Sequence, residues 1–281
     1  GRCVQGLGAG VVPAVTYVVI ARAYDDALRP RLFALMSSAW VIPGLAGPAV
    51  AGAVAEYAHW RWVFWGLLPL LVVSAVMTLP VLRRVPHEAG AVVERRNGRA
   101  LQLALGAALV LGGLTSGEWV FIVGGVVLGG VIAVPALRGL LPAGTLRAAR
   151  GMPAGIMGMG LLNMGFFGAE AFVPFTVTDV RGQSTLVAGA VLASITLTWT
   201  SGSWVLERLS GRFERRAFVA VGVVLTAVGV ASVALILFEA VPVWWAVIAW
   251  GITGFGMGMA YPAYSLIVLS GAAPGEEGAV S

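Results

Sequence analysis

Uncharged segments long enough to cross a lipid bilayer recur along the whole chain of 281 residues. A transmembrane helix needs about 20 predominantly apolar residues, with a lower limit near 17. Eight segments without any charged residue reach this range, and they cover residues 3–21, 32–55, 62–82, 100–117, 119–137, 182–206, 217–238 and 240–275. A ninth segment, 151–178, contains only Glu170 as a charged residue. The sequence therefore predicts an all-α membrane protein with about nine transmembrane helices.

The composition supports a membrane protein and excludes several other classes. Hydrophobic residues make up 59% of the chain and charged residues 11%, whereas a soluble domain has about 25% charged residues. The arginines lie in short loops between apolar segments, so the basic net charge does not indicate a nucleic-acid partner. One cysteine, Cys3, and two distant histidines, His59 and His87, predict no metal site.

The distribution of arginine predicts the orientation of the helices. Cytoplasmic loops of membrane proteins carry most of the arginine and lysine. If the first helix runs inward, only Arg61 and Arg181 lie in outer loops. The predicted cytoplasmic loops then hold Arg22, Arg29, Arg31, Arg83, Arg84, Arg95, Arg96, Arg99, Arg138, Arg147, Arg150, Arg208, Arg212, Arg215 and Arg216. Tryptophans at the predicted outer ends agree, because indole rings favour the membrane interface.

Polar segments divide the chain into five parts. The longest polar segment, 83–99, contains five arginines and reads as a cytoplasmic linker. We expect the remainder of an N-terminal helical bundle over 1–82, an inserted two-helix hairpin over 100–138, a cytoplasmic connector over 139–151 and a partial C-terminal bundle over 152–281.

Three short motifs bear on the family. The first helix begins with Arg2, Gln5, Gly6 and Gly8. The second helix contains Gly47, Pro48 and Gly52, and a tryptophan-rich segment, 60–65, follows it. The third motif lies between the seventh and eighth predicted helices and comprises Gly202, Glu207, Arg208, Gly211 and Arg212.

In this order the motifs resemble the major facilitator superfamily, and the segment 60–65 resembles its branch of fourteen-helix drug:proton antiporters. The first motif is similar to the family's fourth-helix motif, the second to its fifth-helix antiporter motif and the third to its loop motif. Two positions depart from the pattern: Ala51 stands where the antiporter motif usually has glycine, and Glu207 replaces the usual aspartate.

The resemblance implies a helical bundle that begins in helix four and stops after helix twelve, so that three helices are expected before this sequence and two behind it. It also implies export of small organic compounds across the bacterial plasma membrane, driven by the proton gradient, with no cofactor. The expected partners are the small-molecule substrate and the lipid bilayer, and the full-length protein is expected to be a monomer.

Glu170 is the strongest candidate for a functional residue. It lies eight residues before the end of its apolar segment, which places it about 12 Å below the outer surface of a helical span. A carboxyl group at that depth is costly unless it faces a cavity or a partner, and hydrocarbon favours its neutral form. Glu170 is therefore a candidate for proton coupling or substrate binding, with a structural hydrogen bond as the alternative. Asn163 lies about two turns away and is a candidate on the same face.

The other candidates have structural alternatives too. Arg2 resembles the family's fourth-helix arginine, implied in proton coupling, but an arginine at that place can also anchor the helix at the interface. Gly47 and Pro48 predict a hinge or a permanent kink. Glu207, Arg208 and Arg212 predict a cytoplasmic gate or a charged loop that only sets orientation.

Other functions fit the sequence less well. An importer or metabolite transporter of the same fold is distinguished by lacking the Gly47–Pro48 antiporter motif. A membrane-embedded enzyme needs a cluster of histidine and acidic residues at one face, which this chain does not offer. No phosphate-binding loop indicates ATP as the energy source.

Overall fold

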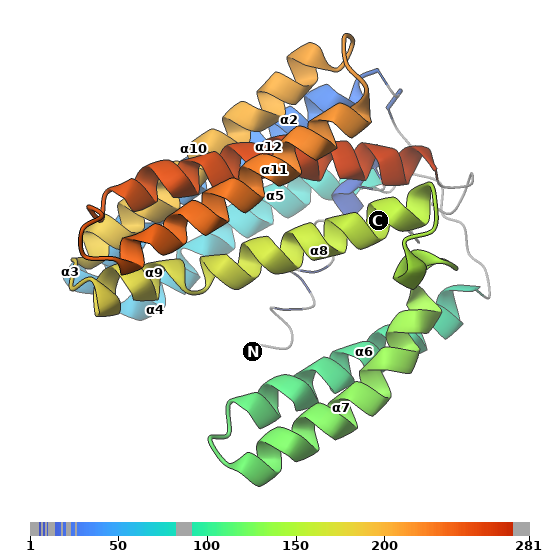
Figure 1. Cartoon of the computed structure of the whole chain (residues 1–281), viewed down its shortest axis with the longest axis horizontal. Helices are drawn as coiled ribbons and strands as arrows, with labels where there is room; N and C mark the ends of the chain where they lie inside the picture. The colour runs from blue at the N-terminus through green and yellow to red at the C-terminus, as the bar shows by residue number, and fades with distance from the viewer. Residues whose placement is uncertain are drawn as a thin grey trace. The chain divides into compact units, whose positions relative to one another are not determined.

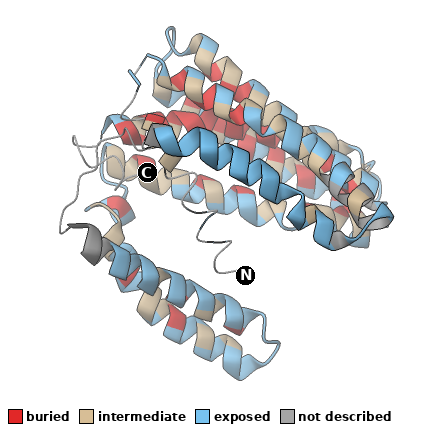
Figure 2. Ribbon diagram, turned by 180° about the vertical axis from the view of Figure 1, so that it is seen from behind, coloured by how far each residue is buried: buried red, intermediate tan, exposed pale blue. Residues whose placement is uncertain are grey.

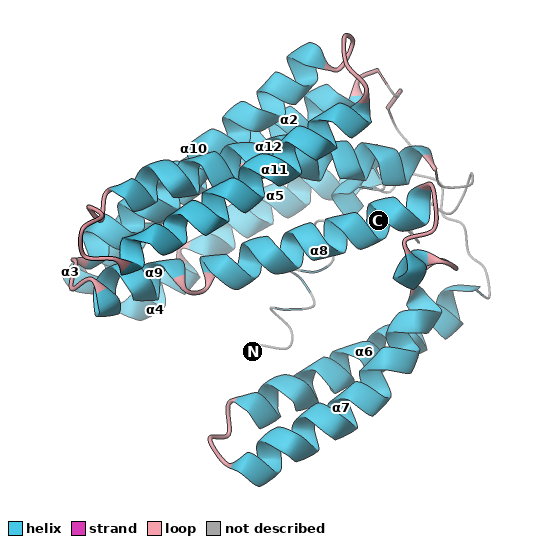
Figure 3. Ribbon diagram, viewed as in Figure 1, coloured by secondary structure: helices cyan, strands magenta, loops and turns pink. Residues whose placement is uncertain are grey.

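The protein is described by a computed structural model in which every element of the described residues is a helix (Figures 1 and 3). It describes residues 27–82 and 92–271 continuously, and residues 6, 8, 10, 15–17, 19, 20, 24 and 25 individually. The α-helices are α2 (Arg29–Ala39), α3 (Val41–Tyr57), α4 (Trp60–Trp65), α5 (Leu67–Leu82), α6 (Val92–Leu114), α7 (Trp119–Leu140), α8 (Met152–Glu170), α9 (Val173–Phe175), α10 (Thr185–Leu209), α11 (Arg215–Val233) and α12 (Trp245–Ser270). Shorter helical turns are η1 (Thr145–Arg147), η2 (Thr176–Val180) and η3 (Ala234–Leu237).

Six helical segments of the described residues are long and apolar enough to cross a membrane: Arg61–Pro80, Trp119–Leu140, Met152–Val180, Leu186–Leu209, Arg215–Leu237 and Trp245–Ser270. They correspond to six of the nine predicted spans and confirm the all-α membrane fold. Of the other three, 3–21 falls largely outside the described residues, 32–55 is divided between α2 and α3, and 100–117 lies mostly in α6, whose first turns are charged.

The chain forms two compact units. The smaller is Pro86–Met157, and the larger combines Gly1–Val85 with Gly158–Ala279. In the smaller unit, α6 and α7 form a hairpin that turns at Gly117, whose φ of +76° favours glycine. A Cβ atom on Gly106 would lie 2.7 Å from the carbonyl oxygen of Gly129. Glycine therefore brings the two helices into backbone contact. The role of the hairpin as an insertion, like the other predicted boundaries, stays a prediction.

Helix α12 forms the centre of the larger unit, where it packs against α10 and α11. Buried residues gather in the helices of this unit (Figure 2). Small residues permit the contacts: a Cβ atom on Gly256 would lie 2.6 Å from the carbonyl oxygen of Gly222, and one on Gly258 would overlap the carbonyl oxygen of Trp199. Close packing through small residues replaces hydrophobic exclusion as the attraction between helices in lipid.

The predicted second span divides at Trp40, between α2 and α3. Pro43 lies in the first turn of α3 and has no N–H group for the carbonyl of Ala39, so the intrahelical hydrogen-bond series breaks there. Beyond this point the backbone of α3 stays helical through Gly47, Pro48 and Gly52. The division is therefore N-terminal to the predicted hinge.

Candidate functional site

Glu170 is the last residue of α8, at an interruption within the span Met152–Val180. Ala171 and Phe172 form a turn before α9 begins. Pro174 explains the interruption, because it lacks the N–H group that would bond the carbonyl of Glu170 four residues earlier. The side chain of Glu170 is half-buried and has no hydrogen bond or ion pair with any described residue. An ionisable group thus lies at a helix break inside an apolar span, which is typical of a transport site.

Asn163 lies two turns before Glu170 on α8, as predicted from the spacing. Its side-chain oxygen Oδ1 is buried, and no hydrogen-bond donor among the described residues reaches it. A buried polar atom without a partner is uncommon, because desolvation is then uncompensated. The inner face of α8 therefore carries an amide acceptor and a carboxyl group, both open to further partners.

An aromatic layer, formed by Phe166, Trp199, Trp250 and Tyr261, packs against this stretch of α8. Phe166 lies between Asn163 and Glu170 and stacks on Trp250 of α12, with ring centroids 5.5 Å apart and planes 13° apart. It also meets the edge of Trp199 of α10 at 5.6 Å, and Trp199 lies 5.7 Å from Tyr261. The layer connects α8, α10 and α12.

Trp250 is fully buried, yet its indole nitrogen Nε1 has no hydrogen-bond acceptor among the described residues. The sequence motifs did not single out Trp250. Its burial could have been anticipated only from the glycines that follow it in α12, since they mark a helix in close contact with others. Together with Asn163 and Glu170, it places donor and acceptor groups in apolar surroundings.

The antiporter motif lies within α3, but the closest contact of this helix is made by another glycine. A Cβ atom on Gly44 would lie 2.8 Å from the side chain of Thr196 on α10. A Cβ atom on Gly47 would meet nothing within 4 Å. The described contacts thus assign packing to Gly44, and the hinge role of Gly47 and Pro48 stays a prediction.

The residues of the predicted gate occupy two different environments. Gly202 is buried inside α10, where a Cβ atom would overlap the carbonyl oxygen of Phe255 in α12. Glu207 and Arg208 lie in the last turn of α10, and Gly211 and Arg212 lie exposed in the following turn. No ion pair joins Glu207 to either arginine in this part of the structure. The gate role stays a prediction, and Arg2 lies outside the described residues.

Arg181 has a structural role that the sequence did not reveal. Its Nη1 donates to the carbonyl oxygens of Ile236 and, at 2.9 Å, Phe238. Its Nη2 donates to the carbonyl of Val241 at 3.0 Å. These carbonyls lie at and after the end of α11 and η3, where a helix leaves acceptors unsatisfied and a cation is favourable. Arg181 therefore holds the predicted outer ends of two spans together.

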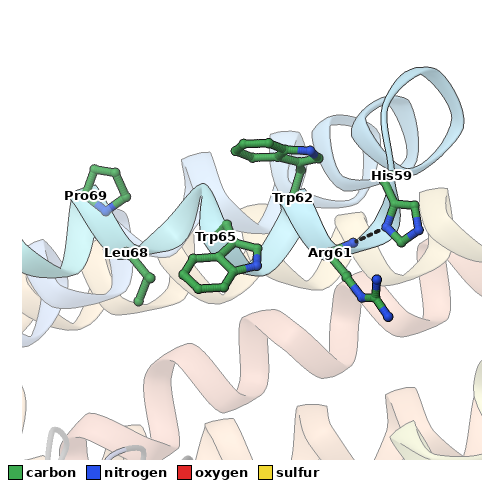
Figure 4. Close-up of a pocket in the computed structure, with 6 residues that line it drawn as sticks. All are labelled: His59, Arg61, Trp62, Trp65, Leu68 and Pro69. Atoms are coloured by element: carbon green, nitrogen blue, oxygen red, sulfur yellow. Dashed lines mark hydrogen bonds between the residues drawn. The ribbon is translucent and has the colours of Figure 1, made fainter.

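A hollow of about 780 Å³ lies beside α4 and the start of α5, and its lining residues are His59, Arg61, Trp62, Trp65, Leu68 and Pro69 (Figure 4). The backbone N–H of Arg61 donates to Nδ1 of His59 at 3.2 Å, which caps α4. Indole rings beside a guanidinium are typical of the membrane–water interface. The hollow agrees with the predicted outer end of this span.

A second hollow, of about 540 Å³, lies among α10, α11 and α12. Its lining is almost entirely apolar and includes Leu197, Leu225 and Ile252. It contains no charged group, in contrast to the stretch of α8 that carries Glu170.

Comparison with known proteins assigns the family. The model of the Major Facilitator Superfamily matches residues 1–281, the whole chain. The chain belongs to this superfamily. The Major Facilitator Superfamily comprises transporters, so the helices described above belong to a multi-pass membrane transporter.

Several curated superfamily members named for drug or antibiotic resistance are similar to the chain. The methylenomycin A resistance protein of Bacillus subtilis is 25% identical over 97% of this chain and 60% of its own length. The multidrug export protein EmrB of Escherichia coli is 25% identical over 81% of this chain and 46% of its own length. The multidrug efflux pump SdrM of Staphylococcus aureus is 28% identical over 28% of this chain. The chain thus spans about half of its full-length relatives, and no solved structure matches it.

Proposed function

We propose that this chain is part of a proton-coupled secondary transporter that exports small organic compounds across the bacterial plasma membrane by alternating access. The observation that carries the proposal is the position of Glu170, a half-buried carboxyl group at a helix break inside an apolar span. Such a group can take up and release a proton as its surroundings change between two states. The names of the similar resistance and efflux proteins support export as the direction.

The arrangement around Glu170 also supports an organic substrate. Phe166 and Trp250 offer apolar and aromatic surface, while Asn163 Oδ1 and Trp250 Nε1 are an acceptor and a donor without partners among the described residues. Sites for small molecules are mostly apolar with a few polar groups that orient the ligand. We propose further that the transporter uses no cofactor, has the lipid bilayer and the substrate as its partners, and works as a monomer without nucleic acid.

Ethidium efflux from cells that express the full-length protein tests this function. Wild type is compared with Glu170→Gln, with and without a protonophore. Glu239→Gln is the matched control, because Glu239 lies in an exposed loop. We expect energised efflux in wild type and the control, and its loss in Glu170→Gln and on uncoupling. Efflux in Glu170→Gln at the wild-type rate would reduce Glu170 to a structural group, and energised accumulation in place of efflux would support an importer.

A further inference from the structure

Hydrogen bonds join α2, in the first part of the chain, to α10, in the last part. Oγ of Ser37 and Oγ of Ser203 are 2.9 Å apart, and both residues are buried. Oγ1 of Thr200 donates to the carbonyl oxygen of Ser37 at 3.1 Å. Nε1 of Trp204 donates to Oγ of Ser38 at 2.8 Å. These five residues form the α2–α10 contact.

The contact lies toward the predicted cytoplasmic ends of both helices. Ser37 follows the start of α2 at Arg29 by eight residues, and Ser203 precedes the end of α10 at Leu209 by six. At about 1.5 Å per residue the two positions are roughly 12 Å and 9 Å from the helix ends. Both ends adjoin the arginine-rich loops that predict the cytoplasmic side.

Apolar packing continues the contact toward the cytoplasm. One buried cluster combines Ile20 and Phe33 from the first part of the chain with Leu206, Met259 and Leu266 from the last part. Nearby, the hydroxyl of Tyr17 donates to that of Tyr261 at 3.1 Å. The two parts of the chain are thus closed against each other at this end.

The hydroxyl groups of the α2–α10 contact each have a second partner within their own helix. Ser37 and Ser38 of α2 reach the carbonyl oxygens of Phe33 at 3.0 Å and Ala34 at 2.9 Å. On α10, the corresponding acceptors are the carbonyls of Thr196 at 3.0 Å for Thr200 and of Trp199 at 3.1 Å for Ser203. If the helices part, every hydroxyl therefore keeps an acceptor, so the uncompensated burial that makes most buried polar contacts costly to break does not arise.

We propose that the α2–α10 contact is a reversible latch that closes the cytoplasmic end of the transport pathway and opens once in each transport cycle. The structure then corresponds to the state closed to the cytoplasm. This inference rests on the proposed function, because a latch between the two parts of the chain is needed only if they separate during transport. Its strength is modest, since hydrogen bonds between helices in a membrane contribute little each. A modest contact suits an equilibrium that must run in both directions.

Cross-linking tests whether the latch opens. Ser37→Cys and Ser203→Cys are combined in the full-length protein with Cys3→Ser, and Ser37→Cys with Ser201→Cys is the control, because Ser201 is exposed and bonds only within α10. We expect oxidation to cross-link the first pair alone, to abolish ethidium efflux, and reduction to restore it. Failure to cross-link, or efflux by the cross-linked protein at the reduced rate, would overturn the latch.

A second measurement keeps the latch testable if ethidium is not transported. Thr196→Cys lies one turn beyond the latch as seen from the cytoplasm, and a membrane-impermeant maleimide is applied to inside-out vesicles. We expect Ser37→Ala with Ser203→Ala to raise its labelling rate about fivefold, the scale of a weak coupling between two states. The control Ser201→Ala leaves the rate unchanged. An unchanged rate in the double variant would overturn the latch, whereas absent efflux in wild type together with faster labelling would count against the proposed substrate only.

Discussion

The span Trp245–Ser270 and the span Arg61–Pro80 differ in an instructive way. Both are long and apolar enough to cross a membrane, and Arg61–Pro80 is the more apolar of the two. Yet 72% of the most apolar window of Trp245–Ser270 is buried inside the protein, against 0% for Arg61–Pro80. Apolarity alone therefore identifies a membrane span but not the span that packs against other helices.

Residue size accounts for the difference. Helix α12, which forms the buried span, has glycine at positions 251, 254, 256 and 258 and alanine at 260, where backbones of α10 and α11 come close. Helix α5 is rich in leucine and valine, and its described side chains are exposed. Large apolar side chains are as well solvated by lipid as by protein, so small residues decide where helices associate.

The largest expected effect comes from the aromatic layer on the buried span. Trp250→Ala leaves a large cavity beside Phe166 and should lower the free energy of unfolding by about 3–5 kcal/mol. Trp250→Phe keeps the ring stack and removes an N–H group without a described partner, so the loss should stay below about 1.5 kcal/mol. Thermal unfolding of the purified protein in detergent measures both. Equal losses would mean that the indole nitrogen has an essential partner.

A small-to-large change in α12 should have the next largest effect. Ala260 is fully buried, and its Cβ atom lies 2.7 Å from where a Cβ atom on Gly222 would be. Ala260→Leu must push α11 and α12 apart and should cost about 1–3 kcal/mol. The recovery of monodisperse protein after heating gives a direct reading. If Ala260→Leu is tolerated without loss, small residues do not hold this bundle together.

The two ends of α11 extend the comparison to arginines. Arg181→Ala removes charge-assisted hydrogen bonds from carbonyls after the end of α11 and should cost about 2 kcal/mol. Arg216→Ala, at the exposed start of α11, should change stability by less than about 0.5 kcal/mol. The same unfolding measurement compares them. A loss in Arg216→Ala as large as that in Arg181→Ala would argue that net charge, and not the carbonyl contacts, stabilises the helix.

The smallest effect should come from the matched change in α5. Ala75 is exposed on a helix whose described side chains contact little of the protein. Ala75→Leu should therefore shift stability by less than about 0.5 kcal/mol. Measured beside Ala260→Leu, it isolates the effect of position from that of the substitution. A large loss would show that another part of the protein covers this face of α5.

The sequence was sufficient for the fold class and for the position of Glu170. Long uncharged segments have few alternatives to spanning a membrane, and the single charge in 151–178 identified Glu170. The division at Trp40 was not predicted, because Pro43 acts through a carbonyl four residues earlier and the Gly47–Pro48 pair drew the hinge elsewhere. The Arg181 contacts and the α2–α10 latch join residues more than 50 positions apart, so no local pattern reveals them.

Proton movement during transport tests the central claim most directly. The full-length protein is reconstituted in liposomes that contain a pH-sensitive dye, and ethidium is added on one side. The account predicts proton movement opposite to ethidium in wild type and its absence in Glu170→Gln. Ethidium transport without any proton movement in wild type, or with undiminished proton movement in Glu170→Gln, would contradict it.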